Sequence, residues 1–173
     1  MKKVLIIGNC GSGKSTFAKK LAAKTNLPLV HLDKLYWRGN RETVTRAEFD
    51  TYLQKELEKH EWIIDGNYNR TIGHRLDYCD TVFYFDLPTI TCLKGVILRT
   101  YKNRGKVRDD MNENRPEKFD RMFFGLCKNV LRFNRKYRKY YYRLLDLSPK
   151  INKIIFKSRE EADSFLEKIE KSV

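Results

Sequence analysis

Residues 8–15, close to the start of the chain, read Gly-Asn-Cys-Gly-Ser-Gly-Lys-Ser and match G-x-x-x-x-G-K-[ST] at every specified position. A continuous apolar run, residues 4–7, comes directly before this loop, and residues 14–24 have the periodicity of a helix. The pattern binds nucleoside triphosphates when it lies between a buried strand and a helix, as it does here. We therefore predict a P-loop domain that binds ATP.

Each part of the loop has a chemical role in this prediction. Glycines let backbone N–H groups curl around phosphate oxygens, and the following helix directs its positive end at them. We expect Lys14 to reach the β- and γ-phosphates and the Ser15 hydroxyl to ligate Mg²⁺. The residues expected to bind the nucleotide are Gly8, Asn9, Cys10, Gly11, Ser12, Gly13, Lys14, Ser15 and Thr16.

Apolar segments and helical segments alternate along the rest of the 173 residues. Two helices open with a capping box, Thr45-x-x-Glu48 and Ser158-x-x-Glu161. This alternation predicts a single three-layer α/β domain, residues 1–173, with a parallel sheet. The expected further strands are 29–32, 62–64, 81–85 and 153–156, and the expected further helices are about 47–59, 90–101, 117–145 and 158–169.

Two of these strands are predicted to end in an aspartate, Asp33 and Asp65. In a parallel sheet both carboxylates emerge at the edge that carries the phosphate loop. Carboxylates there can hold Mg²⁺ or accept a proton from an attacking hydroxyl. We predict catalytic roles for Lys14, Asp33 and Asp65, with Ser15 and Asp65 at the metal. Which aspartate is the base stays open, and a turn or helix cap is the alternative for each.

Four side chains near these aspartates each allow two interpretations. Arg70 ends the polar loop 65–70, where its guanidinium suits a substrate phosphate or carboxylate, and a surface arginine is the equal alternative. Tyr36 and Trp37 can stack on a substrate ring or pack their own segment, and packing is slightly favoured. His31 has apolar neighbours on both sides, which favours a hydrogen-bonded strand histidine over a catalytic one.

The order of these elements resembles that of the adenylate kinase-like small-molecule kinases. More narrowly, residues 11–16 (Gly-Ser-Gly-Lys-Ser-Thr), 29–33 with Tyr36-Trp37, and 62–68 (Trp-Ile-Ile-Asp-Gly-Asn-Tyr) look like the bacterial family of DNA topology modulation proteins. The resemblance covers nearly the whole chain. It implies a P-loop NTPase fold with a five-stranded parallel sheet, a substrate cap at about 34–60 and a mobile lid near 99–115.

The resemblance also implies roles for single residues. Asp65 and Arg70 are similar to the D-G-x-x-R loop of nucleotide kinases, with a spacing one residue longer here. Arg99, Arg104 and Arg108 fall where lid arginines clamp the transferring phosphates. The Thr-Gly-Asp…Arg signature that adenylate kinases use for the monophosphate is absent after the second strand, so AMP is not the expected acceptor. The implied substrate contacts are Asp33, Tyr36, Trp37, Arg70 and Arg99, and Arg104 and Arg108 join the catalytic set.

The chain has a formal net charge of +14, and residues 94–143 contain 16 Lys and Arg against 5 Asp and Glu. Residues 134–143 interleave aromatic and basic side chains, as surfaces for single-stranded nucleic acid do. The aromatic residues nevertheless recur at steps of three or four, as in the core stripe of an amphipathic helix. The predicted stripe is Phe119, Phe123, Leu126, Val130, Phe133, Tyr137, Tyr141 and Leu144.

We therefore favour phosphoryl transfer from ATP, with Mg²⁺, to a nucleoside, nucleotide or similar small molecule. The alternative is a nucleic-acid-binding or DNA-topology-related regulatory NTPase that uses the basic C-terminal half. The longest apolar stretches have four residues, too few for a membrane span or a signal peptide. The four cysteines show no C-x-x-C spacing, which disfavours a zinc site. We expect a cytoplasmic protein with reduced thiols and no membrane partner, and its oligomeric state stays open.

Overall fold

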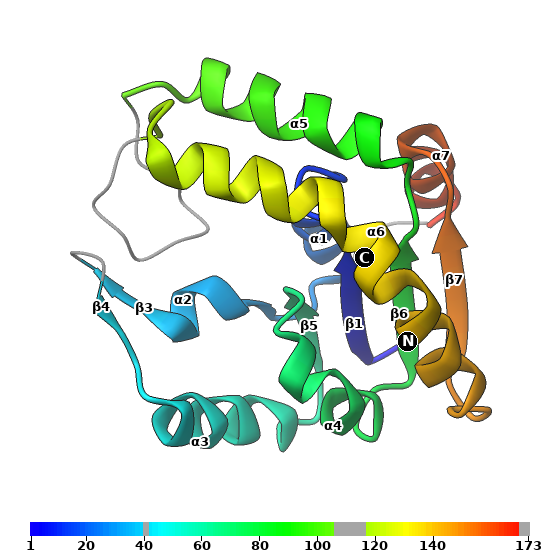
Figure 1. The fold of residues 1–173 in the computed structure, drawn as a ribbon. Helices are drawn as coiled ribbons and strands as arrows, with labels where there is room; N and C mark the ends of the chain where they lie inside the picture. Colours follow the sequence, from blue (N-terminus) through cyan, green and yellow to red (C-terminus); the bar gives the residue numbers. More distant parts are fainter. Residues whose placement is uncertain (40–41, 106–116, 170–173) are drawn as a thin grey trace.

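The computed structural model describes residues 1–39, 42–105 and 117–169. Within them, five strands form one parallel sheet in the order β2-β5-β1-β6-β7 (Figure 1). The predicted five-stranded parallel sheet is confirmed. The strands are β1 (Lys3–Gly8), β2 (Leu29–His31), β5 (Trp62–Asp65), β6 (Thr81–Phe85) and β7 (Asn152–Phe156).

Helices cover both faces of this sheet and give three layers. Successive residues of a strand face opposite sides of the sheet. Leu5 and Ile7 pack with α3, α4 and the second half of α6, whereas Val4 and Ile6 pack with α1, α5 and α7. All four side chains are buried, so β1 is covered on both faces. The helices are α1 (Lys14–Thr25), α2 (Leu32–Tyr36), α3 (Arg46–Leu57), α4 (Ile72–Leu76), α5 (Thr89–Lys102), α6 (Arg121–Asp146) and α7 (Arg159–Lys168).

The strand order reverses at β1. The chain reaches β5 and β2 on one side of β1 and β6 and β7 on the other. In open α/β sheets, ligands bind beyond the carboxyl ends of the strands at such a switch point. The phosphate loop follows β1, and Asp65 ends the neighbouring β5 opposite Ile6, so the loop and this carboxylate meet at the same edge.

The prediction that Asp33 ends a strand is wrong. Strand β2 stops at His31, and Asp33 lies in the short helix α2 that follows directly. Leu32 is completely buried, and a buried leucine suits a strand and a helix equally, so the apolar run does not mark the boundary. A hairpin that the sequence did not predict, β3 (Trp37–Gly39) with β4 (Glu42–Thr43), then leads to α3.

Side chains cap the helices as the sequence predicted, with one boundary moved. Thr45 and Glu48 form the reciprocal capping box of α3, and the Ser158 hydroxyl accepts from the backbone N–H of Glu161 in α7. Helix α6 begins at Arg121 instead of near 117. Its true cap is Asp120, whose carboxylate accepts two backbone N–H groups of the first turn.

The aromatic stripe of α6 packs against the sheet, as predicted. Phe133 and Tyr141 are buried, and Tyr141 is completely inaccessible. Phe119 lies before the helix and is 43% exposed, so it does not belong to the stripe. At the far end Leu145 is buried, and the predicted Leu144 is partly buried and packs against the same core. No helix within the described residues has the length and apolarity needed to cross a bilayer.

Candidate functional site

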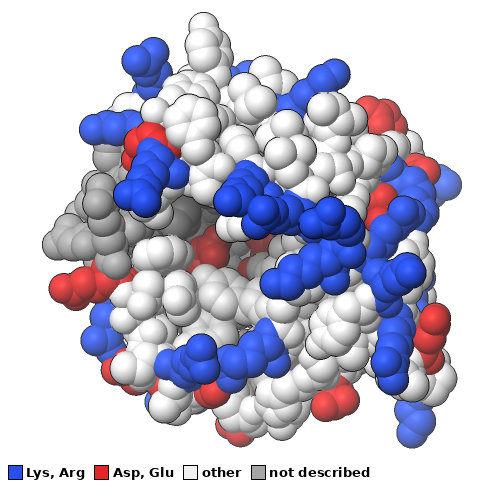
Figure 2. All heavy atoms as spheres, viewed as in Figure 1, with Lys and Arg blue, Asp and Glu red and all other residues white. Residues whose placement is uncertain are grey.

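A cavity of about 1130 Å³ opens beyond the carboxyl ends of β1, β5 and β2. Figure 2 shows the hollow on one face of the molecule, with acidic side chains inside it and Lys and Arg along its rim. Small-molecule sites commonly have a volume of this order. The predicted residues that line the cavity are Cys10, Gly11, Ser12, Gly13, Lys14, Ser15, Thr16, Asp33, Trp37, Asp65 and Arg99.

The phosphate loop is fixed from several sides. Helix α5 packs directly on it, because a Cβ atom added to Gly95 would come within 2.1 Å of the Gly11 carbonyl oxygen. The buried Asn9 side chain donates to the Val130 carbonyl of α6 at 3.0 Å. Lys14 Nζ donates to the Asn9 carbonyl at 2.8 Å. The loop is therefore held in shape by its neighbours, with the lysine at its centre.

Asp65 is one of the residues that line this cavity. The residue is only 5% exposed, and its Oδ2 lies 3.2 Å from His31 Nδ1. The other oxygen, Oδ1, is buried and has no hydrogen-bond partner among the described residues; the same is true of Ser12 Oγ in the phosphate loop. Buried polar atoms without a partner carry a large free-energy cost, so these two atoms indicate a ligand that the cavity receives. The expected hydrogen-bonded role of His31 is confirmed.

Asp33 lines the same cavity as Asp65. The Tyr68 hydroxyl donates to Asp33 Oδ1 at 2.9 Å. Burial raises the pKa of Tyr68, and the Asp33 carboxylate raises it further, so the phenol keeps its proton and remains a donor. Tyr36 packs against Tyr68 and Phe49 with ring centroids 5.2 and 5.9 Å away, as expected, and Trp37 lines the cavity beside it.

A buried arginine that the sequence reasoning missed supports this wall. Arg75 of α4 is 0% exposed and donates to the carbonyl oxygens of Gly66, Asn67 and Tyr68. Burial lowers the pKa of Arg75 to about 10, so the guanidinium remains charged at neutral pH. It holds Tyr68 at φ 34°, a backbone conformation that is strained for a bulky residue. Asn67 Oδ1 in turn accepts the Gly8 N–H at 3.0 Å, which ties this loop to the phosphate loop.

The structure places Arg70 outside the cavity. Its guanidinium makes two hydrogen bonds to Asp50 of α3, and both side chains are about half exposed. This pair lowers the pKa of Asp50 through the hydrogen bonds from Arg70. The signal for Arg75 was present in the sequence: Ile72, Arg75 and Leu76 recur at the spacing of one helix face, which puts the arginine in an apolar stripe.

The two arginines form a matched pair for a stability measurement. We expect Arg75→Leu to lower the free energy of unfolding by about 3 kcal/mol or more, because it leaves the carbonyl groups of Gly66 and Asn67 without the hydrogen bonds that Arg75 donates to them. Arg70→Leu removes an exposed ion pair and should cost less than about 1 kcal/mol. Urea unfolding of both variants tests this. Equal losses would show that the carbonyl groups do not depend on Arg75.

Of the three predicted lid arginines, the structure, in its described part, brings one to the cavity. Arg99 of α5 lines the cavity, and its Nε lies 3.6 Å from Glu117 Oε1. Arg104 is exposed and lies outside the cavity lining, where its backbone bridges to Glu117. Arg108, with most of the predicted lid, lies outside the described residues. Arg99 is thus the one lid arginine that the described structure brings to the site.

A second arginine at the site was not predicted. Arg159, at the start of α7, donates to the phosphate-loop carbonyls of Gly11 at 2.6 Å and Ser12 at 3.3 Å, and it lines the cavity. It stands 147 residues from Ser12 in the chain, so no local pattern links the two. Its position places a positive charge beside the loop that is predicted to bind phosphate.

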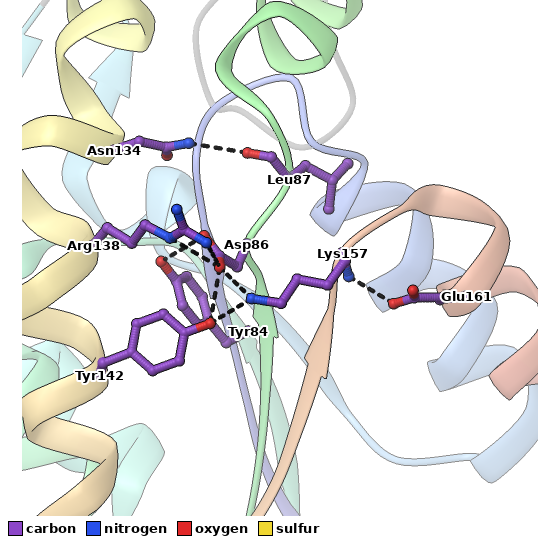
Figure 3. Close-up of polar contacts among 8 residues, drawn as sticks. All are labelled: Tyr84, Asp86, Leu87, Asn134, Arg138, Tyr142, Lys157 and Glu161. Atoms are coloured by element: carbon purple, nitrogen blue, oxygen red, sulfur yellow. Dashed lines mark hydrogen bonds and ion pairs between the residues drawn. The ribbon is translucent and has the colours of Figure 1, made fainter.

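An ion cluster surrounds the buried carboxylate of Asp86, directly after the end of β6 (Figure 3). The carboxylate of Asp86 accepts from Arg138 at 2.8 Å, from Tyr142 at 2.8 Å and from Lys157 at 2.5 Å. The Asp86 side chain is 1% exposed. The cluster joins β6, α6 and the segment that leads into α7, and so fixes α6 against the sheet. Arg138, one of the basic residues of segment 134–143, therefore makes a structural contact.

This cluster predicts a pH dependence of stability. Burial opposes the charge on Asp86, but the hydrogen bonds from Lys157, Tyr142 and Arg138 outweigh it and hold the pKa below its usual value. A lowered folded pKa means that ionised Asp86 stabilises the fold above about pH 4, and that this stability is lost as the pH falls through the folded pKa. We expect Asp86→Asn to cost about 2 kcal/mol at pH 7 and less at pH 3.

Thermal unfolding at both pH values checks this, with Asp146→Asn on the exposed end of α6 as the control. A loss for Asp86→Asn that is the same at both pH values would contradict an ionised cluster.

The oxygen atoms of Ser15 and Asp65 suit a nucleotide with bound Mg²⁺. No group of three His, Cys, Asp or Glu in the described part of the chain is placed to bind a metal ion by itself. Mg²⁺ is usually bound by one or two protein oxygens together with phosphates and waters, which is what Ser15 and Asp65 offer beside the phosphate loop. The unpartnered Asp65 Oδ1 and Ser12 Oγ are the atoms such a ligand would satisfy.

No protein-family model and no curated protein matches the sequence. Solved structures with a similar fold include two shikimate kinases. The one from Bacteroides thetaiotaomicron is 17% identical, with a TM-score of 0.57 and 95% of this chain and 93% of that chain covered. The one from Acinetobacter baumannii, solved in complex with shikimate, is 19% identical, with a TM-score of 0.56 and 98% and 90% covered.

A sugar kinase from a Janibacter species is 15% identical, with a TM-score of 0.53 and 96% and 91% covered. These similarities concern the fold: the chain has the three-layer fold of the adenylate kinase-like P-loop kinases.

Proposed function

We propose that this chain is an ATP-dependent phosphotransferase that moves the γ-phosphoryl group of ATP to a hydroxyl of a small molecule. The observation that carries the proposal is one cavity whose lining includes both the phosphate loop and the carboxylates of Asp33 and Asp65. Phosphoryl transfer needs mainly positioning and charge stabilisation, and these parts supply both. The fold shared with small-molecule kinases supports the reaction class by analogy.

The two carboxylates divide the work in this proposal. Ser15 and Asp65 hold Mg²⁺, because Asp65 Oδ1 is buried without a partner beside the phosphate loop. Bound Mg²⁺ neutralises charge on the phosphate oxygens. Asp33 accepts the proton of the acceptor hydroxyl, since it lines the cavity and the hydroxyl of Tyr68 orients it. Lys14 stabilises the charge on the β- and γ-phosphates.

The acceptor binds in the half of the cavity on the β5 and β2 side. Segment 34–60, which contains the end of α2, the hairpin and α3, acts as its cap and supplies Trp37 to the wall. Asp33 of block 29–33 and residues 65–68 of block 62–68 also line the cavity. These two blocks are also the ones that resemble the DNA topology modulation proteins, and we propose kinship with that family on this basis.

The alternative, a regulatory NTPase that binds nucleic acid, rests on one observation. Figure 2 shows basic side chains gathered over α6 on the face that also carries the hollow. Most of the aromatic stripe of α6 packs inward, but Phe124, Leu131 and Tyr140 are exposed on the outside together with the basic residues. The exposed basic residues of this helix are Arg121, Lys128, Arg132, Arg135, Lys136, Arg138, Lys139 and Arg143.

The proposal is tested by looking for a phosphorylated product. The protein is incubated with ATP, Mg²⁺ and pools of hydroxyl-bearing metabolites, and mass spectrometry identifies any compound that gains a phosphoryl group, with Lys14→Ala as the inactive control. One defined product that depends on Lys14 is expected. ATP hydrolysis that is stimulated by DNA, with no phosphorylated small molecule, would support the alternative instead.

A further inference from the structure

Arg159 joins the start of α7 to the phosphate loop. Its Nη2 atom donates to the Gly11 carbonyl oxygen at 2.6 Å, and its Nε atom donates to the Ser12 carbonyl oxygen at 3.3 Å. The side chain also lines the cavity. Two donors of one planar guanidinium therefore hold two successive carbonyl groups of the loop.

These two carbonyl groups belong to the peptide units whose N–H groups come from Ser12 and Gly13. A trans peptide unit is planar, and its C=O and N–H bonds point in opposite directions. The Ser12 N–H accordingly points away from Arg159, and its nitrogen lies 3.3 Å from the Asn9 carbonyl oxygen. Lys14 Nζ donates to the same oxygen at 2.8 Å. Arg159 thus lies on the outer side of the loop and directs backbone donors to the inner side, where Lys14 ends.

The glycines of the loop leave the orientation of these peptide units open. Gly11 has φ +75° and Gly13 has φ +107°, and each of the two units adjoins one of them. Glycine adopts positive and negative φ with similar ease, so a peptide unit beside it can turn over at low cost. Successive backbone N–H groups that face one side form the concave site that binds phosphate. A guanidinium that holds both carbonyl groups keeps the units in this orientation before a ligand arrives.

The side chain of Arg159 is itself fixed by its surroundings. Lys157 binds the carboxylate of Asp86 (Figure 3), and Ser158 caps α7. These contacts anchor the backbone directly before Arg159. Gly95 of α5 leaves the space that the guanidinium fills, because a Cβ atom there would lie 2.3 Å from Arg159 Nη2. The side chain is therefore held at both ends, at its backbone and at its guanidinium.

From these contacts we propose that Arg159 is a positioning residue for the triphosphate, which pre-organises the phosphate loop from outside. It holds the carbonyl groups of Gly11 and Ser12 and thereby aims the N–H groups of Ser12 and Gly13 at the phosphates. Its charge also polarises the two peptide units, which strengthens their N–H groups as donors. The inference rests on the triphosphate binding in the proposed function and is independent of the acceptor.

Three ligands that share a triphosphate test this role: ATP, GTP and inorganic tripolyphosphate, each with Mg²⁺ and each measured by calorimetric titration. We expect Arg159→Met to weaken binding of all three by the same factor, about tenfold, because the loop contacts phosphates and not the base. Arg159→Lys keeps the charge but lacks the fork that spans two carbonyl groups, and should weaken binding by about threefold. Lys168→Met, at the exposed other end of α7, removes the same charge and should leave binding unchanged.

The free energy of unfolding is measured beside the affinity, to separate positioning from a purely structural role. Asp80→Ala removes a carboxylate that accepts the backbone N–H groups of Lys2 and Lys3 at the opposite edge of the sheet. It should lower stability without changing the affinity for ATP, whereas Arg159→Met should weaken binding under conditions where it is fully folded. If the methionine variant does not fold, Arg159→Lys decides, because it retains the aliphatic stem and the charge.

The outcomes separate the role of Arg159 from the proposed function. Normal binding by the wild type, with unchanged affinity in both Arg159 variants, overturns the role of Arg159 and leaves phosphoryl transfer standing. A loss for ATP and GTP but not for tripolyphosphate, or a wild type that binds ATP but not tripolyphosphate, places the effect at the nucleoside and overturns the loop role. A wild type that does not bind ATP overturns the proposed function and this inference with it.

Discussion

Replacing Lys14 by alanine is expected to weaken binding of ATP·Mg²⁺ by more than about a hundredfold. The side chain lies inside the phosphate loop, with its Nζ 2.8 Å from the Asn9 carbonyl oxygen and only 8% of the residue exposed. Hydrogen bonds to charged groups contribute roughly 1.5–3 kcal/mol each, and the lysine is predicted to make two of them to the β- and γ-phosphates. The fold should survive, because the loop is also held by Asn9, Arg159 and α5.

Calorimetric titration with ATP·Mg²⁺ measures this effect directly. Lys55→Ala, on the exposed side of α3, removes the same charge away from the cavity and should leave the affinity unchanged. Circular dichroism of the Lys14→Ala protein should match that of the wild type. An affinity that is the same in both variants would mean that the loop does not bind the triphosphate as its sequence predicts.

The second large effect is expected at the two aspartates. Asp33→Asn and Asp65→Asn should each lower turnover with a productive acceptor by at least about a hundredfold, the usual scale for a positioned base or a metal ligand. The two variants should differ in binding. Asp65→Asn should raise the Mg²⁺ concentration needed for half-maximal turnover, because it removes a metal ligand. Asp33→Asn should leave binding of ATP·Mg²⁺ intact, because Asp33 faces the acceptor.

Steady-state rates across a range of Mg²⁺ concentrations, with binding of ATP measured separately, test this division. Asp77→Asn is the control for an exposed aspartate in the same part of the chain. Rates within about twofold of the wild type for both variants would remove both carboxylates from the chemistry.

Much of the fold was predictable because its signals are local. The strands are short apolar runs with clear ends, and the capping boxes of α3 and α7 mark where these helices start. The exception is the boundary after β2. Leu32 is buried in the helix that follows, so the apolar run continues past the strand and carries Asp33 with it. Over only four residues, hydrophobic periodicity does not distinguish the end of a strand from the start of a helix.

The candidate site was predictable only where its residues lie in one motif. The phosphate loop and Asp65 belong to such segments. Arg159 and the Asp86 cluster do not, because their partners lie far away in the chain, at Gly11 and at Arg138 and Lys157. Contacts between residues so far apart in the chain produce no local pattern that a single sequence could show.

Arg70 and Arg75 illustrate a different difficulty. Both follow the same Asp-Gly loop, and the loop position of Arg70 favoured it as a substrate contact. The structure places Arg70 on Asp50 and uses Arg75 to hold the loop backbone. The deciding factor is burial: α4 directs Arg75 inward with Ile72 and Leu76, and a charge there must find backbone acceptors.

Phosphoryl transfer to a small molecule is tested most directly by comparing two variants in two assays. One variant is Asp65→Asn, and the other reverses the charge of Arg135, Lys136 and Lys139 to Glu while leaving Arg138 on Asp86. Acceptor-dependent ADP formation and DNA affinity are measured for both at a series of stated salt concentrations. Transfer to a small molecule predicts that Asp65→Asn loses turnover by at least about a hundredfold and that the charge reversal leaves it nearly intact. Normal turnover in Asp65→Asn, together with a lower DNA affinity and a shallower salt dependence in the charge-reversed variant, would contradict it.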